Sequence, residues 1–126
     1  DYGISAATSG NTFLTTSFQT LESFTLAASK EAGTHAIIAV GDVGGTITSG
    51  SQVRFDILHG GTSVANYTSS VGAGASQAFV LAAQVSASTT QSKLFQLQGK
   101  RLSSDTDLVS FNTAIFAIKL TASTQS

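Results

Sequence analysis

Asp56 and His59 are an acid and a base three residues apart, and with one of the many serines they could form a nucleophilic triad. Such a triad needs the three side chains within hydrogen-bond reach of one another. Asp56 and His59 fall at positions of opposite parity on one expected strand, so their side chains point to opposite faces of a sheet. The sequence therefore predicts no catalytic triad and no catalytic residues at this position.

Metal-ligating and acid/base side chains are equally scattered. The only histidines are His35 and His59, neither has a carboxylate or second histidine at ligand spacing, and the chain has no cysteine. Glu22 and Glu31 do not form an acid/base pair, since Glu31 lies beside Lys30 in an expected turn. Asp105-Thr106-Asp107 is similar to acidic calcium motifs but lies in a serine-rich turn. We expect no metal, no cofactor and no enzymatic activity.

A glycine-rich segment offers a weak phosphate-binding motif. Residues 41–46 read GDVGGT, which resembles the phosphate-binding strand and turn of sugar kinases of the actin-like superfamily. Those kinases need two large domains, whereas 126 residues form one. We expect a strand end that runs into a glycine turn.

The charge content excludes several classes of partner. Charged residues make up 10% of the chain, the net charge is −1, and Lys100-Arg101 is the only basic doublet, which disfavours nucleic-acid binding. Apolar runs such as Ala36 to Val40 are far shorter than the ~20 residues that a membrane-spanning helix needs. We expect neither nucleic acid nor a membrane as a partner.

Alternating apolar and polar residues, separated by glycine and serine turns, predict an all-β fold. Serine and threonine exceed a quarter of the residues. The fold we expect is an antiparallel two-sheet sandwich, jelly-roll-like, with about eight strands. Residues 1–11 are expected to form a flexible N-terminal arm, and residues 12–126 a single β-sandwich domain. The expected strands span 12–20, 21–28, 34–43, 51–59, 62–69, 76–87, 93–102 and 108–120.

The turn at Gly60-Gly61 is the clearest hairpin signal. Two glycines supply the positive φ angles of a two-residue turn between strands. With a regular ladder, this turn places Ile57 opposite Val64 and Arg54 opposite Tyr67.

Three expected strands are apolar on both faces. The strand over 51–59 alternates normally, with Val53, Phe55 and Ile57 inward and Gln52, Arg54 and Asp56 outward. The strands over 34–43, 76–87 and 108–120 instead carry a second apolar face, which would leave a large patch in water. Another copy of the same sheet would cover this patch, so we expect an obligate homo-oligomer. The expected interface residues are Ile38, Val80, Phe116 and Ile118.

An alternative function is carbohydrate binding. A lectin-like module needs an exposed aromatic ring beside amide or carboxylate side chains. Asp56, Asn66 and Tyr67 form the candidate group for such a glycan contact.

A family resemblance points to the leading function. The passages that carry it are SFTLAASKEAGTHAIIAVGDV, QVRFDILHGGTSVA, QAFVLAAQVSA and SFNTAIFAIKL, which together lie within about four fifths of the chain. Their strand and turn pattern resembles small jelly-roll domains of structural proteins of tailed bacteriophages, similar to the head fold of tumour necrosis factor and complement C1q. The resemblance implies tight, usually trimeric assemblies that serve as capsid decoration or cement proteins, or as head domains of head or tail fibres.

We therefore expect a non-enzymatic virion structural protein, a capsid decoration or cement protein that oligomerises and stabilises the phage shell. A fibre head domain and a carbohydrate-binding module are the alternatives. The expected partners are other copies of the chain, as a homotrimer, and the major capsid protein or another virion protein. The expected location is the virion surface.

Overall fold

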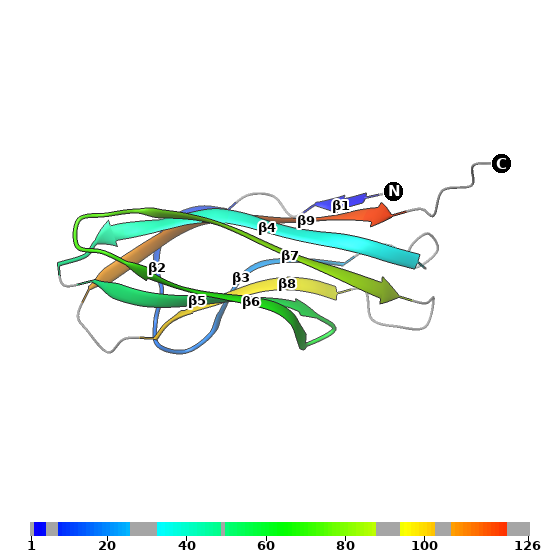
Figure 1. The fold of residues 1–126 in the computed structure, drawn as a ribbon, viewed down its shortest axis with the longest axis horizontal. Coiled ribbons are helices and arrows are strands. Elements are labelled where there is room, and N and C mark those ends of the chain that lie inside the picture. Colours follow the sequence, from blue (N-terminus) through cyan, green and yellow to red (C-terminus); the bar gives the residue numbers. More distant parts are fainter. Residues whose placement is uncertain are drawn as a thin grey trace.

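The computed structural model describes residues 2–4, 8–25, 33–48, 50–87, 94–102 and 107–120, with side chains described from Leu14 onward except those of residues 87 and 108. These residues contain no helix and form nine strands in two antiparallel sheets that pack face to face (Figure 1). The all-β, two-sheet sandwich predicted from the sequence is therefore confirmed.

We call the two layers sheet A and sheet B. Sheet A has the order β1-β9-β4-β7, with β2 also paired to β9, and sheet B has the order β3-β8-β5-β6. The strands of sheet A are β1 (Tyr2–Ile4), β2 (Thr8–Phe13), β4 (Gly33–Thr46), β7 (Gln77–Ala87) and β9 (Leu108–Leu120). Those of sheet B are β3 (Gln19–Thr25), β5 (Ser51–His59), β6 (Thr62–Val71) and β8 (Leu94–Arg101).

The strand pairs are nested around one turn. Gly60 and Gly61 have φ of 58° and 87°, as a two-residue hairpin turn requires, and they join β5 to β6. Around this hairpin, β4 pairs with β7, β3 with β8, and β2 with β9, all antiparallel. A long hairpin of four strand pairs that is rolled into two sheets is the jelly-roll arrangement.

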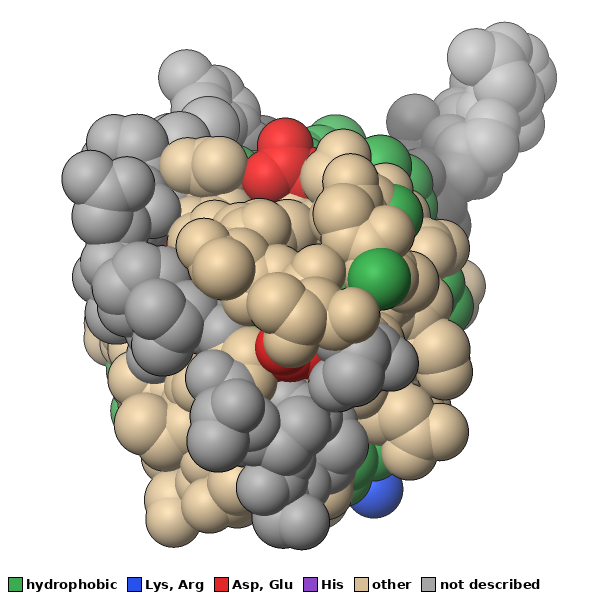
Figure 2. Space-filling model, turned by 90° about the vertical axis from the view of Figure 1, so that its left-hand side faces the viewer, with side chains coloured by type: hydrophobic (Ala, Val, Ile, Leu, Met, Phe, Trp, Pro, Cys, Tyr) green, Lys and Arg blue, Asp and Glu red, His purple; other side chains and the backbone are tan. Residues whose placement is uncertain are grey.

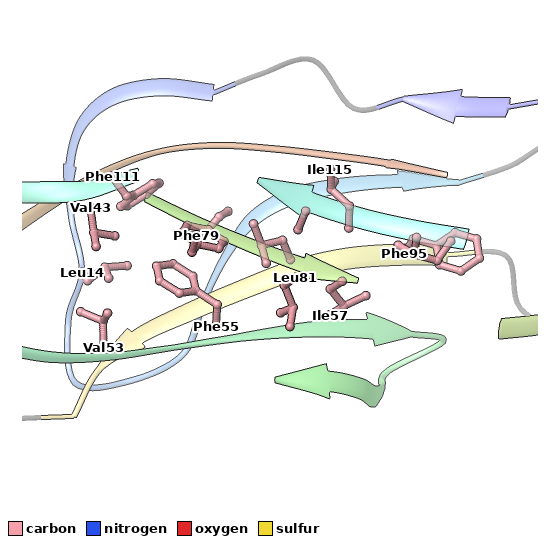
Figure 3. Close-up of a cluster of buried hydrophobic side chains, with 14 of the residues drawn as sticks. Leu14, Val43, Val53, Phe55, Ile57, Phe79, Leu81, Phe95, Phe111 and Ile115 are labelled. Carbon is pink, nitrogen blue, oxygen red and sulfur yellow. The ribbon is translucent and has the colours of Figure 1, made fainter. Parts of the chain in front are cut away.

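The core fills the space between the sheets with alternate residues of the long strands (Figure 3). Inward side chains of β4, β5 and β9 are fully buried, among them Ile37, Phe55 and Ile115. The Phe55 and Phe79 rings stack across the layers with centroids 4.2 Å apart. Gly41 makes room for this stack, since a Cβ there would lie 2.9 Å from the Phe79 ring.

The N-terminal region differs from the expected arm. Residues 2–4 and 8–13 pair with β9 as β1 and β2, so they cover the edge of β9 that faces away from β4. The expected strands over 12–20 and 21–28 are divided differently as well. The chain leaves sheet A after β2, and β3 begins at Gln19. Residues 26–28 lie outside the described part.

The predicted register of the central hairpin is wrong. His59 pairs with Thr62 and Leu58 with Ser63, but Ile57 then pairs with Ala65, so Val64 is an extra residue in β6. Such a bulge shifts every later pair by one residue. Arg54 consequently lies opposite Thr68, and Tyr67 lies opposite Phe55 on the inner face.

The expected faces of the other strands are confirmed. Val53, Phe55 and Ile57 point into the core, and β4, β7 and β9 each carry apolar side chains on both faces, as predicted. The bounds of β5 and β9 match the expected strands over 51–59 and 108–120.

Candidate functional site

The outer face of sheet A carries a continuous apolar surface across three strands. Val40 pairs with Val80 on one side and with Ala114 on the other, and Ile38 pairs with Ala82 and Phe116. Paired residues project from the same face of a sheet, so these side chains are immediate neighbours. We call this surface the sheet A patch; it comprises Ala36, Ile38, Val40, Ala78, Val80, Ala82, Ala114, Phe116, Ile118 and Leu120.

Large side chains of the sheet A patch are exposed. Val80 is 69% exposed, Ile118 43% and Leu120 44%. Figure 2 views the sandwich end-on, and hydrophobic side chains gather at its upper margin, on the side where sheet A lies in Figure 1. The four interface residues predicted from the sequence, Ile38, Val80, Phe116 and Ile118, all belong to this one face.

Polar side chains border the sheet A patch at both ends of the strands. At one end the Asn112 amide donates a hydrogen bond to Asp42 (3.1 Å), and at the other Thr34 and Ser86 share a hydrogen bond of 3.3 Å. Among the described side chains of this face, Asp42 is the charged one. An apolar centre with a polar rim is typical of protein interfaces.

The size of the sheet A patch is that of an interface core. The patch spans residues 36–40, 78–82 and 114–120 of three strands, which at about 3.3 Å per residue and about 4.8 Å between strands cover roughly 270 Å². The largest patches on monomers reach about 300 to 600 Å² and are often functional, while each partner of a standard interface buries about 800 Å². The patch therefore supplies about a third of such an interface, and its rim can supply the remainder.

The outer face of sheet B has the opposite character. Asp56 pairs with Asn66 on β6 and with Gln98 on β8, and Arg54 pairs with Thr68 and with Lys100. These four partners lie on the same outer face as Asp56 and Arg54, and three of them carry a hydroxyl or amide group. Figure 2 shows a basic side chain at the lower margin, on the side where sheet B lies in Figure 1.

The Asp56 carboxylate is the best-connected group on this face. It accepts two hydrogen bonds from the Arg54 guanidinium (2.7 and 3.2 Å) and one from the Ser63 hydroxyl (2.8 Å). Burial by itself raises the pKa of Asp56, but these hydrogen bonds, with the charges of Arg54 and Lys100, outweigh it and hold the pKa below its ordinary value of 3.8. Asp56 therefore remains ionised at neutral pH.

The predicted glycan group is only partly assembled. Asp56 and Asn66 are cross-strand partners, as the expected group requires. Tyr67 lies on the inner face because of the bulge at Val64, and its ring stacks on Phe79 with centroids 6.3 Å apart. The structure thus separates Tyr67 from Asp56 and Asn66.

Phe18 supplies an aromatic ring beside this polar face instead. The chain crosses between the sheets after β2, with Leu14 N donating to Val109 O (2.9 Å) and Arg101 N donating to Thr15 O (2.7 Å). This crossing brings Phe18, which is 40% exposed, to Lys100 and Arg54. The Lys100 ammonium lies 4.4 Å from the ring centroid and the Arg54 guanidinium carbon 6.0 Å. Phe18, Lys100 and Gln98 are members of this face that the glycan group predicted from the sequence does not include.

The remaining acid and base candidates hold the sandwich together. His59 stacks on Phe95 (4.9 Å), whereas Asp56 lies on the opposite face of β5, so the structure does not assemble a triad from them. His35 is buried on the inward face of β4. Glu31 lies outside the described residues, and no group of three or more metal-ligating side chains occurs among the described ones.

Asp107 ties the loop after β4 to the start of β9. Its buried carboxylate accepts hydrogen bonds from the Thr48 amide (2.9 Å), the Thr48 hydroxyl (2.7 Å) and the Ser51 hydroxyl (3.2 Å). These bonds give Asp107 a structural role in this part of the chain, while Asp105 lies outside the described residues. The GDVGGT segment is the end of β4, where Gly41 packs against the backbone of β9.

Comparisons with known proteins add little to this geometry. No family model matches the chain, and no curated protein does either. A solved cyclase structure from Fischerella sp. TAU is similar, at 16% identity and a TM-score of 0.49, over 88% of this chain and 61% of the cyclase chain. This chain thus spans less than two thirds of that protein's length, and a similarity at this level carries no information on activity. In the described part of the chain, no helix is long and apolar enough to span a membrane.

Proposed function

We propose that this protein is a non-enzymatic structural component of a phage particle surface, a capsid decoration protein that assembles through the outer face of sheet A. The observation that carries the proposal is the sheet A patch, which runs across β9, β4 and β7 with Val80 69% exposed. The assignment to a phage particle rests on the resemblance of the strand and turn pattern to phage jelly-roll domains.

A second copy of the chain is the occupant that suits the sheet A patch best. The patch has no charged side chain within it, so two copies can face each other without like-charge repulsion. Sheets pack face to face about 10 Å apart through interdigitating side chains, and the mixture of alanine with larger residues permits this. Burying roughly 270 Å² per copy contributes roughly 7 kcal/mol per copy, against an association cost of about 4 to 15 kcal/mol.

A closed ring of copies is consistent with this geometry, since closed symmetry hides the same patch on every subunit. The resemblance implies three copies. In such a ring, sheet A of each subunit faces its neighbours and the outer face of sheet B remains free. Attachment to the shell would stabilise the capsid by mass action, because the oligomer binds assembled capsid protein and not its separated subunits.

The first experiment measures the mass of the purified chain by sedimentation velocity at 1 to 50 µM, about the range over which a micromolar complex dissociates. We expect a closed oligomer of the 12.8 kDa chain. Val80→Asp buries a charge in the interface and should raise the dissociation constant by at least about tenfold.

Val64→Asp is the matched control, since Val64 is also an exposed valine but lies on β6 of the other sheet. It should leave the mass unchanged. A wild-type chain that remains at 12.8 kDa over this concentration range, or equal effects of the two substitutions, would contradict assembly through sheet A.

A second experiment tests the particle role. The purified chain is mixed with DNA-free capsids of tailed phages, and the pellets are assayed for bound chain. We expect saturable binding to the capsids of the phage to which the chain belongs, together with a higher temperature of capsid disruption. Failure to bind any capsid, with the oligomer intact, would remove the decoration role and leave only self-assembly.

A further inference from the structure

We propose that the outer face of sheet B is a binding site for an acidic saccharide, whose carboxylate or sulfate group binds between Arg54 and Lys100. This site is independent of self-assembly, because it lies on the other sheet. The proposal replaces the expected group around Tyr67 with one that the structure assembles around Phe18.

Two cations lie directly opposite each other on this face. Arg54 on β5 pairs with Lys100 on β8, and like charges at directly opposed positions destabilise a sheet. Both cationic groups converge on the Phe18 ring, at 6.0 Å for Arg54 and 4.4 Å for Lys100. An anionic group that binds between them relieves their mutual repulsion.

The carboxylate on this face does not remove the excess positive charge. Asp56 is buried and holds Arg54 through two hydrogen bonds, which fixes the guanidinium in position. Among the side chains of this face that the structure describes, one carboxylate against two cations leaves a net charge of about +1, although the chain as a whole carries −1. Since the chain has only six lysines and arginines, two on directly opposed positions are a local concentration of positive charge.

The surroundings of the two cations suit a sugar. Hydroxyl and amide side chains lie beside the two cations on the outer face of all four strands, and they are exposed or half-exposed. They provide the donors and acceptors that sugar hydroxyls need. The exposed part of Phe18 offers an apolar surface for the C–H face of a pyranose ring. The polar residues of this face include Thr20, Gln52, Asn66, Thr68, Gln96 and Gln98.

A nucleic acid fits this face less well. Proteins that bind nucleic acid through the backbone neutralise about 6 to 10 phosphates, and this face presents two cations. A saccharide with one or a few acidic groups matches the charge that is present.

The test is isothermal titration calorimetry of the full chain with three hexasaccharides. One is a galacturonate hexamer, which carries carboxylates, one is a heparin-derived hexasaccharide, which carries sulfates, and one is neutral cellohexaose. We expect saturable binding of at least one acidic probe, about tenfold or more tighter than that of cellohexaose. The two acidic probes distinguish carboxylate from sulfate as the recognised group.

Two pairs of variants locate the site. Lys100→Gln should weaken binding about tenfold, whereas Lys119→Gln, which makes the same change in net charge on β9, should change it less than about twofold. Phe18→Ala should weaken binding about fivefold, whereas Leu102→Ala removes a similarly exposed apolar side chain and should have little effect. Circular dichroism of each variant checks that the fold is intact.

Any of three results would contradict the proposed saccharide site. The first is no saturable binding of either acidic probe up to millimolar concentration. The others are equal affinity for cellohexaose, or an equal loss of affinity in Lys100→Gln and Lys119→Gln. The titration is repeated with Val80→Asp, which disrupts the proposed assembly face but leaves sheet B untouched. Saccharide binding that persists in that variant would show that the saccharide site does not depend on self-assembly through sheet A.

Discussion

The Thr113 hydroxyl on β9 donates a hydrogen bond of 2.9 Å to the Glu22 carboxylate on β3, so a buried polar contact joins the two sheets. Both side chains are buried. A bulge in β3 makes this contact possible. Thr20 pairs with Gln98 and Glu22 with Leu97, so Leu21 is the additional residue and both Leu21 and Glu22 are buried. The bulge therefore brings an acidic side chain into the space between the layers.

Removing the Thr113 hydroxyl should destabilise the fold. Thr113→Val keeps the shape of the side chain but leaves a buried carboxylate with one donor fewer, which costs about 1 to 3 kcal/mol. Urea unfolding followed by circular dichroism measures the loss. Thr113→Ser retains the hydroxyl and should be more stable than Thr113→Val, whereas a Thr113→Val protein as stable as wild type would show that this hydrogen bond does not contribute to stability.

Gly41 is a position where no side chain fits. A Cβ there would lie 2.3 Å from the Asn112 carbonyl oxygen and 3.0 Å from the Thr113 side chain, so Gly41→Ala must move the backbone of β9. We expect a loss of about 1 to 3 kcal/mol in the free energy of unfolding. Gly72→Ala is the control, since nothing lies within 4 Å of a Cβ at Gly72, and it should stay within about 0.5 kcal/mol of wild type. A Gly41→Ala protein of wild-type stability would show that β4 and β9 are not packed this closely.

Asp56 should make stability depend on pH in acid. Its pKa in the folded chain is lowered below the ordinary value of 3.8, so the unfolded chain binds the proton more readily. The stabilisation is fully present above about pH 4 and is lost as the pH falls through the lowered pKa. Urea midpoints measured from pH 7 to pH 2 should fall less steeply below pH 4 in Asp56→Asn than in wild type.

Asp42→Asn is the control for this titration, since Asp42 is an exposed carboxylate on the other sheet. An unchanged slope below pH 4 in Asp56→Asn would place the acid sensitivity in other groups. At neutral pH, Asp56→Asn should also lose about 1 to 3 kcal/mol, because the Arg54 guanidinium loses its charged acceptor.

Much of the fold follows from local patterns in the sequence. The alternation of Val53, Phe55 and Ile57 with Gln52, Arg54 and Asp56 fixes the two faces of β5, and the glycine pair after it fixes the hairpin. The second apolar face of β4, β7 and β9 can also be recognised in the sequence, because apolar residues occupy both sets of alternate positions in these strands. For this reason the sequence alone predicts that Ile38, Val80, Phe116 and Ile118 share one surface, and the strand pairing places them on one face.

The bulges at Leu21 and Val64 could not be predicted. A bulge adds one residue to a strand and exchanges the faces of all residues beyond it, yet Leu21 and Val64 have ordinary strand side chains. The prediction of Tyr67 as an exposed ring failed for this reason. The β1 and β2 strands were also missed, because their small polar residues resemble a linker and are ordered as strands by pairing with β9.

The polar outer face of sheet B could be predicted only in part from the sequence. Gln96, Gln98 and Lys100 alternate with buried Phe95 and Leu97, which marks an outward polar face on β8. The position of Phe18 has no such signal. It depends on where the chain crosses between the sheets and on the pairing of Arg54 with Lys100, two residues far apart in the sequence.

The nested strand pairing around Gly60-Gly61 favours a particular order of strand pairing during folding. Each outer strand pair closes a loop that contains every inner pair, and closing a longer loop costs more chain entropy. The pairing of β4 with β9 and of β9 with the N-terminal strands therefore comes late. The surface proposed for subunit association exists only once β9 has docked beside β4, so the proposed assembly would be open only to chains in which this pairing is complete.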